Sequence, residues 1–345
     1  MNLKAVIRCI RAYPIALLQA IDRETNRFYR ASFLSGLLAQ PFAGTLTETS
    51  MSLAEIAREL DLDPDSPELE AWLDMGVSLG VLRRRKGKYA VKSRLARKLI
   101  QGPQSWQAYF RIRVEVFYHY FVATPGKLVQ GERFSLDDSH GELYAQSSRT
   151  VEPVLLDVAR NTGCAEPGPC ALLEVGCGSG VYIQAACEAN PELFVVGLEL
   201  QPSAAALAKR NIQAWGLGGR ATIEQTGLMD YSGPSRHDIV TLHNLIYYFP
   251  LQDRPKAMSH VYSLLKPGGK VILSTLLRSR FPSIQAMHLW SSMNQGCGPL
   301  PHAGEIPELL KEAGFLSIES QELIPGMWCF TAHRPGNAPS TPSTP

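Results

Sequence analysis

Apolar residues recur at helical spacing through most of the first hundred residues of the chain. Three stretches share this spacing: residues 24–42, 50–63 and 67–80. Ser52 and Glu55 are placed as a capping box, and Pro67 follows Ser66 at the first helical position, where proline is favoured. The pattern predicts three helices, the last of which ends at Gly80.

A short basic segment follows these helices. Residues 81–91 predict two strands that turn at Gly87. Helices followed by a basic hairpin are the order of a winged helix, so residues 1–100 are expected to form a mainly α winged-helix domain. The run Arg83–Lys88 could contact nucleic-acid phosphate, but the helix before it carries three acidic residues and no Lys or Arg. Phosphate would repel that helix, so the pattern favours a dimerisation module over DNA binding.

Residues 101–165 are expected to form a helical connecting region. Seven aromatic side chains lie within residues 105–122, and such a stripe is more often core or subunit interface than the lining of a flat substrate's pocket. A polar loop is predicted over 131–144 and a further helix over 147–163. The Pro- and Ser-rich residues 336–345 are expected to be a disordered tail.

The pattern changes to strand, turn, helix and strand from Cys170 onward. Apolar residues run into a turn with glycine at every second position, Gly176, Gly178 and Gly180, and a second apolar strand ends in Glu199. Glycines let a backbone approach a ligand closely, and a carboxylate after the second strand can accept from both hydroxyls of a ribose. This layout predicts a nucleotide-binding βαβ unit.

Composition adds little to this picture. The 345 residues are 45% apolar and 19% charged, which fits a globular chain of two domains, and the formal net charge of +2 indicates no charged partner. The seven cysteines contain no C-x-x-C pair and are interpreted as reduced thiols of a cytoplasmic protein, with no metal site. Arg8, Arg11 and Pro14 interrupt the apolar stretch 6–21, which predicts an amphipathic helix rather than a signal peptide or membrane span.

The charge around the glycine turn indicates which nucleotide it binds. A dinucleotide site has the spacing G-x-G-x-x-G, whereas Val181 stands here at the place of the third glycine. Glu174, just before the turn, would repel a pyrophosphate but suits a ligand with an ammonium group. S-adenosylmethionine has a ribose, an adenine and an amino acid but no phosphate, so these residues favour it over a dinucleotide.

Three motifs together resemble a class I S-adenosylmethionine-dependent methyltransferase over about residues 150–335. They are LLEVGCGSG, the acidic end of VVGLEL, and LLKPGGKVILST. That family has seven strands, the last antiparallel beside the fifth, and residues 316–323 and 327–334 supply a matching hairpin. The resemblance implies an α/β fold, with a Rossmann-like seven-stranded methyltransferase domain at 166–335.

With a winged helix in front, the whole chain resembles the two-domain small-molecule O-methyltransferases. In that family the N-terminal domain is mainly a dimer module that also covers the active site. The resemblance therefore implies a homodimer formed through the N-terminal half, with a small-molecule substrate and neither nucleic acid nor membrane as partner. It also implies a role in secondary metabolism.

The resemblance assigns the cofactor contacts residue by residue. Those at the methionine end and the ribose are Glu174, Gly176, Gly178, Gly180 and Glu199. Where the family has Gly-Asp beside the adenine, this chain has Gly227 and Leu228, so an aspartate is missing from that place. Met229 is expected either on the adenine ring or in the core. Asn244, after the fourth strand, is expected beside the cofactor.

Three residues are candidates for contact with the methyl acceptor. Tyr247 falls where many O-methyltransferases carry a catalytic histidine, but a tyrosine with an ordinary pKa near 10 is a poor base and would rather hold a substrate oxygen. His243 either contacts a ligand of the site or is a histidine at a strand end whose hydrogen bonds are made within the protein. His288 is expected on a helix after the fifth strand, a region from which the family's substrate pocket draws.

Because the sulfonium is an activated methyl donor, the enzyme mainly has to align the acceptor with the methyl group and exclude water. We therefore expect S-adenosylmethionine-dependent methylation of a small aromatic or conjugated metabolite, at oxygen in preference to carbon or nitrogen. Two alternatives stay open: a winged-helix DNA-binding protein that senses S-adenosylmethionine, and a catalytically silent methyltransferase-like scaffold.

Overall fold

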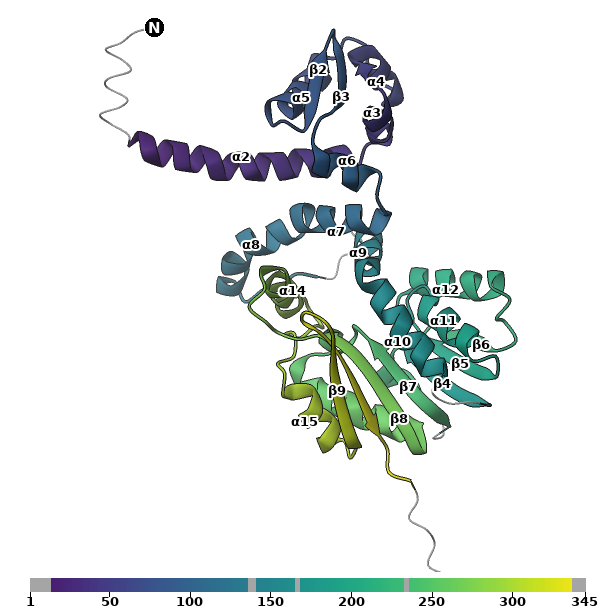
Figure 1. The fold of residues 1–345 in the computed structure, drawn as a ribbon. Coiled ribbons are helices and arrows are strands. Elements are labelled where there is room, and N and C mark those ends of the chain that lie inside the picture. Colours follow the sequence, from purple (N-terminus) through teal and green to yellow (C-terminus); the bar gives the residue numbers. More distant parts are fainter. Residues whose placement is uncertain (1–13, 136–140, 165–167, 233–235, 337–345) are drawn as a thin grey trace, which may run out of the picture. The chain divides into compact units, whose positions relative to one another are not determined.

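The structure is a computed structural model that describes residues 14–135, 141–164, 168–232 and 236–336 (Figure 1). The chain forms two compact units: unit 1 comprises Met1–Val122 and Asp137–Thr150, and unit 2 comprises Ala123–Leu136 and Val151–Pro345. The helix predicted over 6–21 falls among the described residues only from residue 14, and the tail predicted as disordered only at residue 336. Among the described residues, no helix has the length and apolarity needed to cross a membrane.

Unit 1 opens with the predicted winged helix. Its elements up to residue 100 are α2 (Ile15–Leu38), η1 (Pro41–Ala43), α3 (Thr45–Glu48), β1 (Met51–Ser52), α4 (Leu53–Glu59), α5 (Pro67–Ser78), β2 (Leu82–Arg85), β3 (Lys88–Val91) and α6 (Arg94–Ile100). The strands form an antiparallel sheet in the order β1-β3-β2. The predicted helix at 24–42 is the second part of one continuous helix that already begins at Ile15.

Local signals in the sequence set the ends of these helices. The Ser52 hydroxyl accepts from the Glu55 backbone N–H at 3.3 Å, and the Glu55 carboxylate accepts from the Ser52 backbone N–H at 2.6 Å, which is the predicted capping box. Ser66 caps α5 in front of Pro67, and Gly80 adopts φ +68° just beyond its end. These caps bring the apolar faces of the helices against β2 and β3.

The connecting region that follows matches the prediction in part. The aromatic segment 105–122, expected to be helical, forms two helices, α7 (Gln104–Glu115) and α8 (Phe117–Val129). The loop predicted over 131–144 is wrong at its end, because Gly141–Ser148 is helix α9. Leu143 is buried there, so one apolar contact outweighs the polar character of the surrounding sequence. The helix predicted at 147–163 is a short 3-10 turn, η3 (Arg149–Val151), followed by α10 (Glu152–Cys164).

Unit 2 is a seven-stranded sheet with helices packed against it, and it confirms the predicted α/β fold (Figure 1). In spatial order the strands are β6 (Ala221–Glu224), β5 (Leu193–Leu198), β4 (Cys170–Val175), β7 (His237–His243), β8 (Leu265–Leu276), β10 (Met327–His333) and β9 (Leu316–Ile324). The first five are parallel, and β10 runs antiparallel between β8 and β9, as expected. The helices besides α10 are α11 (Val181–Ala189), α12 (Pro202–Ala214), α13 (Arg254–Leu264), α14 (Pro282–Met293) and α15 (Glu305–Glu312).

One motif identified in the sequence lies inside a strand. β8 begins at Leu265 and includes the LKPGG segment of LLKPGGKVILST. Gly268 adopts φ +84° within the strand, and its N–H donates to the Arg334 carbonyl on the neighbouring chain segment at 3.0 Å. The glycine thus bends the strand and continues its pairing instead of ending it.

The sheet's centre explains where a site can form. Side chains of β4 and β7 are buried on both faces, among them Leu172, Leu173, Val240 and Leu242. Strands buried in this way leave only their carboxyl ends open to a ligand, at the edge where the connections run to opposite sides of the sheet. The glycine turn follows β4 at that edge, and Glu199 follows β5.

Candidate functional site

The turn after β4 requires glycine at all three predicted positions. Gly176, Gly178 and Gly180 have φ of +70°, +54° and +82°, a region that other residues enter only at a cost. A Cβ on Gly176 would lie 2.9 Å from Leu245 Cδ1, whereas a Cβ on Gly178 would meet no atom within 4 Å. The backbone at Gly178 therefore faces open space.

Glu199 stands beside this turn, as the sequence predicted. One of its carboxylate oxygens accepts from the Gly178 N–H at 2.9 Å, and the other accepts from the Gln201 N–H at 2.9 Å. Each oxygen keeps a further lone pair for a ligand hydroxyl. The carboxylate thus holds the glycine turn from one side and can receive two hydroxyl groups from the other.

Glu174 is buried next to the turn and is only partly satisfied. Its Oε2 accepts from the Thr241 hydroxyl on β7, while its Oε1 has no hydrogen-bond partner. Burial raises the pKa of this carboxyl to about 7, against a smaller lowering by the Thr241 hydrogen bond. A cationic group placed at Oε1 would favour the ionised form and supply the missing partner.

Two further buried polar atoms lack a partner where β7 ends. His243 Nδ1 lies 3.2 Å from the Ser274 hydroxyl, its Nε2 has no partner, and burial lowers the pKa of its imidazole to about 4. Asn244 adopts φ +54°, and its Oδ1 is likewise buried and unpaired. Because unpaired buried polar atoms are rare, their gathering with Glu174 Oε1 on two adjacent strands indicates a ligand site.

The loop after β6 corrects one prediction. Leu228 is buried in η4 (Leu228–Asp230), but Met229 is 38% exposed, so the core alternative for Met229 is wrong. A Cβ on Gly227 would lie 3.6 Å from both Asp230 Oδ2 and Leu200 Cδ1. An acidic group, Asp230, therefore lies at this loop two positions after Leu228.

Tyr247 lies in the 3-10 turn η5 (Ile246–Tyr248) that follows β7. Its side chain is buried, its ring centroid lies 5.1 Å from that of Tyr248, and its carbonyl accepts from the Gly298 N–H at 2.9 Å. Burial, and secondarily Tyr248, raise the pKa of this phenol well above its ordinary value of 10. Tyr247 is therefore a neutral hydrogen-bonding group and no base at neutral pH.

His288 on α14 has one ring nitrogen engaged. The Leu300 backbone N–H donates to His288 Nδ1 at 3.2 Å, so a neutral ring carries its proton on Nε2. Burial, and secondarily Arg278, lower the pKa of this histidine below its ordinary value of 6.5. His288, a predicted candidate for contact with the acceptor, can therefore offer an N–H to a ligand.

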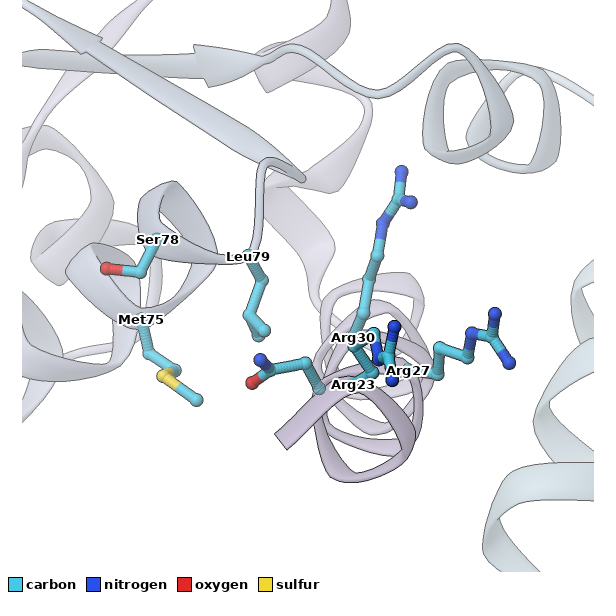
Figure 2. Close-up of a pocket in the computed structure, with 7 residues that line it drawn as sticks. Arg23, Arg27, Arg30, Met75, Ser78 and Leu79 are labelled. Carbon is cyan, nitrogen blue, oxygen red and sulfur yellow. The ribbon is translucent and has the colours of Figure 1, made fainter. Parts of the chain in front are cut away.

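A separate hollow lies in unit 1 and contains none of the predicted site residues (Figure 2). It has a volume of about 450 Å³ and is lined by α2 and the end of α5, through Arg23, Asn26, Arg27, Arg30, Met75, Ser78 and Leu79. Arg27 pairs with Glu24 at 3.1 Å, and Arg30 donates to the Ser93 hydroxyl at 3.3 Å. The hollow is thus a groove along an exposed helix.

Four of the described cysteines are free thiols: Cys177, Cys187 and Cys297 are buried, and Cys329 is partly buried. Burial raises the pKa of the Cys297 thiol to about 11. In the part of the chain that the structure describes, no group of three or more His, Cys, Asp or Glu side chains is arranged to hold a metal ion.

Comparisons with known proteins find similarity to methyltransferases over the glycine turn and the strands beside it. Residues 173–271 match a family model described as a methyltransferase domain. Release factor glutamine methyltransferase of Geobacter sulfurreducens is 36% identical over 184 residues, which cover 49% of this chain and 55% of that protein. The chain spans between 37% and 55% of the length of the curated relatives it matches.

Solved structures share the fold of almost the whole chain. An O-methyltransferase family protein from Burkholderia thailandensis matches with a TM-score of 0.72 at 17% identity, over 93% of this chain and 99% of that chain. Human N-acetylserotonin methyltransferase in complex with SAM matches with a TM-score of 0.65 at 17% identity, over 92% of this chain and 98% of that chain. These matches confirm the predicted fold, a seven-stranded α/β sheet preceded by a mainly helical N-terminal region.

Proposed function

We propose that the chain is an S-adenosylmethionine-dependent methyltransferase that acts on a small molecule. The observation that carries the proposal is the edge where β4 and β7 end. There Glu174 Oε1, His243 Nε2 and Asn244 Oδ1 are buried without partners, beside a glycine turn with open space at Gly178. A ligand with an ammonium group and several hydrogen-bonding groups fits these residues, and the methyltransferase-domain match supports S-adenosylmethionine as that ligand.

Each part of the cofactor has a residue suited to it. Glu174 and Asn244 offer acceptor oxygens to the amino group of the methionine end, and Glu199 offers both carboxylate oxygens to the ribose. Met229, and Leu200 beside Gly227, are exposed apolar side chains suited to the adenine faces. Asp230 takes the exocyclic amine in place of the aspartate missing at Leu228. The bound cofactor supplies a methyl group already activated on a sulfonium.

The acceptor side is built from neutral donors. Tyr247 offers a phenol whose pKa is raised by burial, and His288 offers Nε2–H, so both can hold an acceptor oxygen but neither removes a proton readily. His243 stays uncharged at neutral pH. The chain therefore aligns an acceptor that is itself nucleophilic, and we favour an oxygen. The exposed ring of Tyr248, which packs edge-on against the buried Trp290 with 6.0 Å between the ring centroids, suits an aromatic or conjugated metabolite.

We also propose that the chain forms a homodimer through α2. Large apolar side chains are exposed along this helix: Ile15, Leu17, Leu18, Ile21, Phe28 and Tyr29. Several large exposed apolar side chains on one helix are typical of a surface that a partner covers. A second copy of the same chain fits, because the groove beside α2 offers arginines and the 61–68 segment of the same unit offers exposed acidic residues.

Two glycine variants test the cofactor site. Gly178→Ala places a methyl group in the open space at the turn, and we expect calorimetric titration to show at least about tenfold weaker binding of S-adenosylhomocysteine. Gly216→Ala is the matched control, because Gly216 also has a positive φ, +71°, and open space around its Cβ but lies after α12. Equal binding by both variants would contradict the proposed site.

A further inference from the structure

Unit 2 contains one fully buried arginine, among the residues the structure describes, at the start of α13. Arg254 donates through Nε to the Phe249 carbonyl at 3.2 Å, through Nη2 to the Pro299 carbonyl and through Nη1 to the Glu305 carboxylate. These acceptors belong to three separate segments. Phe249 follows η5, Pro299 follows α14, and Glu305 begins α15.

The segments that Arg254 joins are those that hold the acceptor-side residues. Gly298, next to Pro299, donates its N–H to the Tyr247 carbonyl at 2.9 Å. Leu300, on the other side of Pro299, donates its N–H to His288 Nδ1 at 3.2 Å. Residues 298–300 therefore contact Tyr247 and His288 through two backbone N–H groups, and Arg254 holds the carbonyl between them.

The packing at Gly298 shows how closely these segments approach. A Cβ there would lie 2.7 Å from the Phe249 carbonyl oxygen and 2.9 Å from Arg254 Nη2. Gly298 has no positive φ, so its backbone would accept another residue and only the space excludes one. The buried guanidinium and this glycine together bring the two loops into direct contact.

We propose that Arg254 and Glu305 are positioning residues of the proposed methyltransferase, and that they fix the tautomer of His288 and the place of Tyr247. The catalytic role of these residues rests on the proposed function. Their effect on the His288 imidazole can be measured whether or not the chain is a methyltransferase. A planar guanidinium presents donors in a fixed fork, which matches two carbonyls and a carboxylate in a way that a lysine cannot. With Leu300 held, His288 presents Nε2–H to the acceptor.

Nuclear magnetic resonance of protein labelled at histidine with ¹⁵N tests the proposal without any acceptor. The His288 signals are assigned by their loss in His288→Gln. In the parent we expect the neutral form to be protonated at Nε2. In Arg254→Lys, Glu305→Gln and Gly298→Ala we expect a mixture of tautomers and a pKa that rises by about half a unit or more toward its ordinary value. Arg278, which also faces this histidine, is unchanged throughout.

Matched controls separate this effect from general destabilisation. Asp238→Asn breaks the ion pair with Lys266, 2.8 Å long, at the opposite end of β7, and Gly219→Ala adds a methyl group that meets no atom within 4 Å. Both should leave the His288 tautomer as in the parent. If Arg254→Lys fails to fold, the Glu305 and Gly298 variants decide the question.

The proposal is overturned if His288 keeps the parent's tautomer and pKa in the folded Glu305→Gln and Gly298→Ala proteins. Binding of S-adenosylhomocysteine, measured on the same samples, keeps the two proposals apart. The parent and all of these variants should bind it equally, since the cofactor residues lie at or after the ends of β4, β5, β6 and β7. Failure of the parent to bind would contradict the proposed function and leave the His288 result standing.

Discussion

Glu174 is a buried carboxyl group, and without a cationic ligand its surroundings favour the protonated form. Its pKa of about 7 in the folded chain lies above its ordinary value of 4.5 because of burial. The folded state therefore keeps this proton over a pH range in which the unfolded chain has lost it. Between about pH 4.5 and 7 the stability conferred by the protonated group is lost as pH rises, and above pH 7 the loss is complete, on the order of 3 kcal/mol.

Glu174→Gln should accordingly have opposite effects on stability and on binding. Without ligand, the variant should unfold at a higher temperature than the parent at pH 8, and the difference should disappear near pH 5. At the same pH 8 it should bind S-adenosylhomocysteine more weakly, because the carboxylate that faces the amino group is gone. Thermal unfolding from pH 5 to 8.5 measures the effect on stability, and calorimetric titration at pH 8 measures the effect on binding. A variant less stable than the parent at pH 8 would contradict this account of Glu174.

Individual site residues differed in how far the sequence could predict them. The positive φ of Gly176, Gly178 and Gly180 follows from their spacing after a strand, so their place was predictable. The partners of Glu174 and His288 were not, because Thr241 and Leu300 are distant in sequence. Such contacts depend on strand register and loop packing, which a single sequence does not encode locally.

At the level of elements, local caps decided the boundaries. Ser52 and Glu55 form the box that starts α4, and we expect Ser52→Ala to lower the free energy of unfolding of the chain by about 1 kcal/mol. Urea denaturation followed by circular dichroism measures the change. Thr47→Ala is the control, because the Thr47 hydroxyl is exposed and bonds only to a carbonyl within its own turn, that of Gly44. A loss no larger than that of the control would show that the box does not stabilise α4.

The pairing of α5 with the hairpin bears on the DNA-binding alternative. Arg84 forms ion pairs with Glu70 at 2.8 Å and Asp74 at 3.3 Å, so one of the hairpin's cations is bound to the acidic helix of its own unit. That helix would still meet a phosphate backbone with its acidic face. We expect no retardation of random duplex DNA in a gel shift at physiological salt. Retardation that is lost on Arg83→Gln and Arg85→Gln would revive the DNA-binding alternative.

Elements with strong local signals matched the sequence, and those set by distant packing did not. The hairpin about Gly87 and the helix after Ser66 have turn and cap residues of their own. By contrast, α9 depends on the burial of Leu143, and the glycines of the LKPGG segment continue β8 because Arg334 pairs with them. Propensity alone predicts a loop in both places.

For the whole molecule, the proposed dimer makes a prediction that a single substitution can test. Ile21 is 47% exposed on α2, and a glutamate there would put a charge into a covered apolar face. We expect the parent to be a dimer by light scattering and Ile21→Glu to have the mass of a monomer. Leu207→Glu, at an exposed position on α12 in unit 2, should remain dimeric. A parent of monomer mass would contradict the role of α2.

The architecture of both units could be predicted because most segments show either a helical or a strand spacing of apolar residues, and not both. Residues of the predicted connecting region are divided between the units, with α7 and α9 in unit 1 and α10 in unit 2. Neither this division nor the acceptor's identity follows from periodicity, because both depend on which surfaces meet in three dimensions.

The central claim is that the edge where β4 and β7 end binds S-adenosylmethionine, and calorimetric titration tests it most directly. Purified parent protein is titrated with S-adenosylhomocysteine and, separately, with NADH. We predict saturable one-to-one binding of the first, with a Kd of about micromolar or tighter, and no binding of the second, because Glu174 repels a pyrophosphate. Binding of NADH, or of neither ligand, would contradict the claim and return the silent-scaffold alternative to consideration.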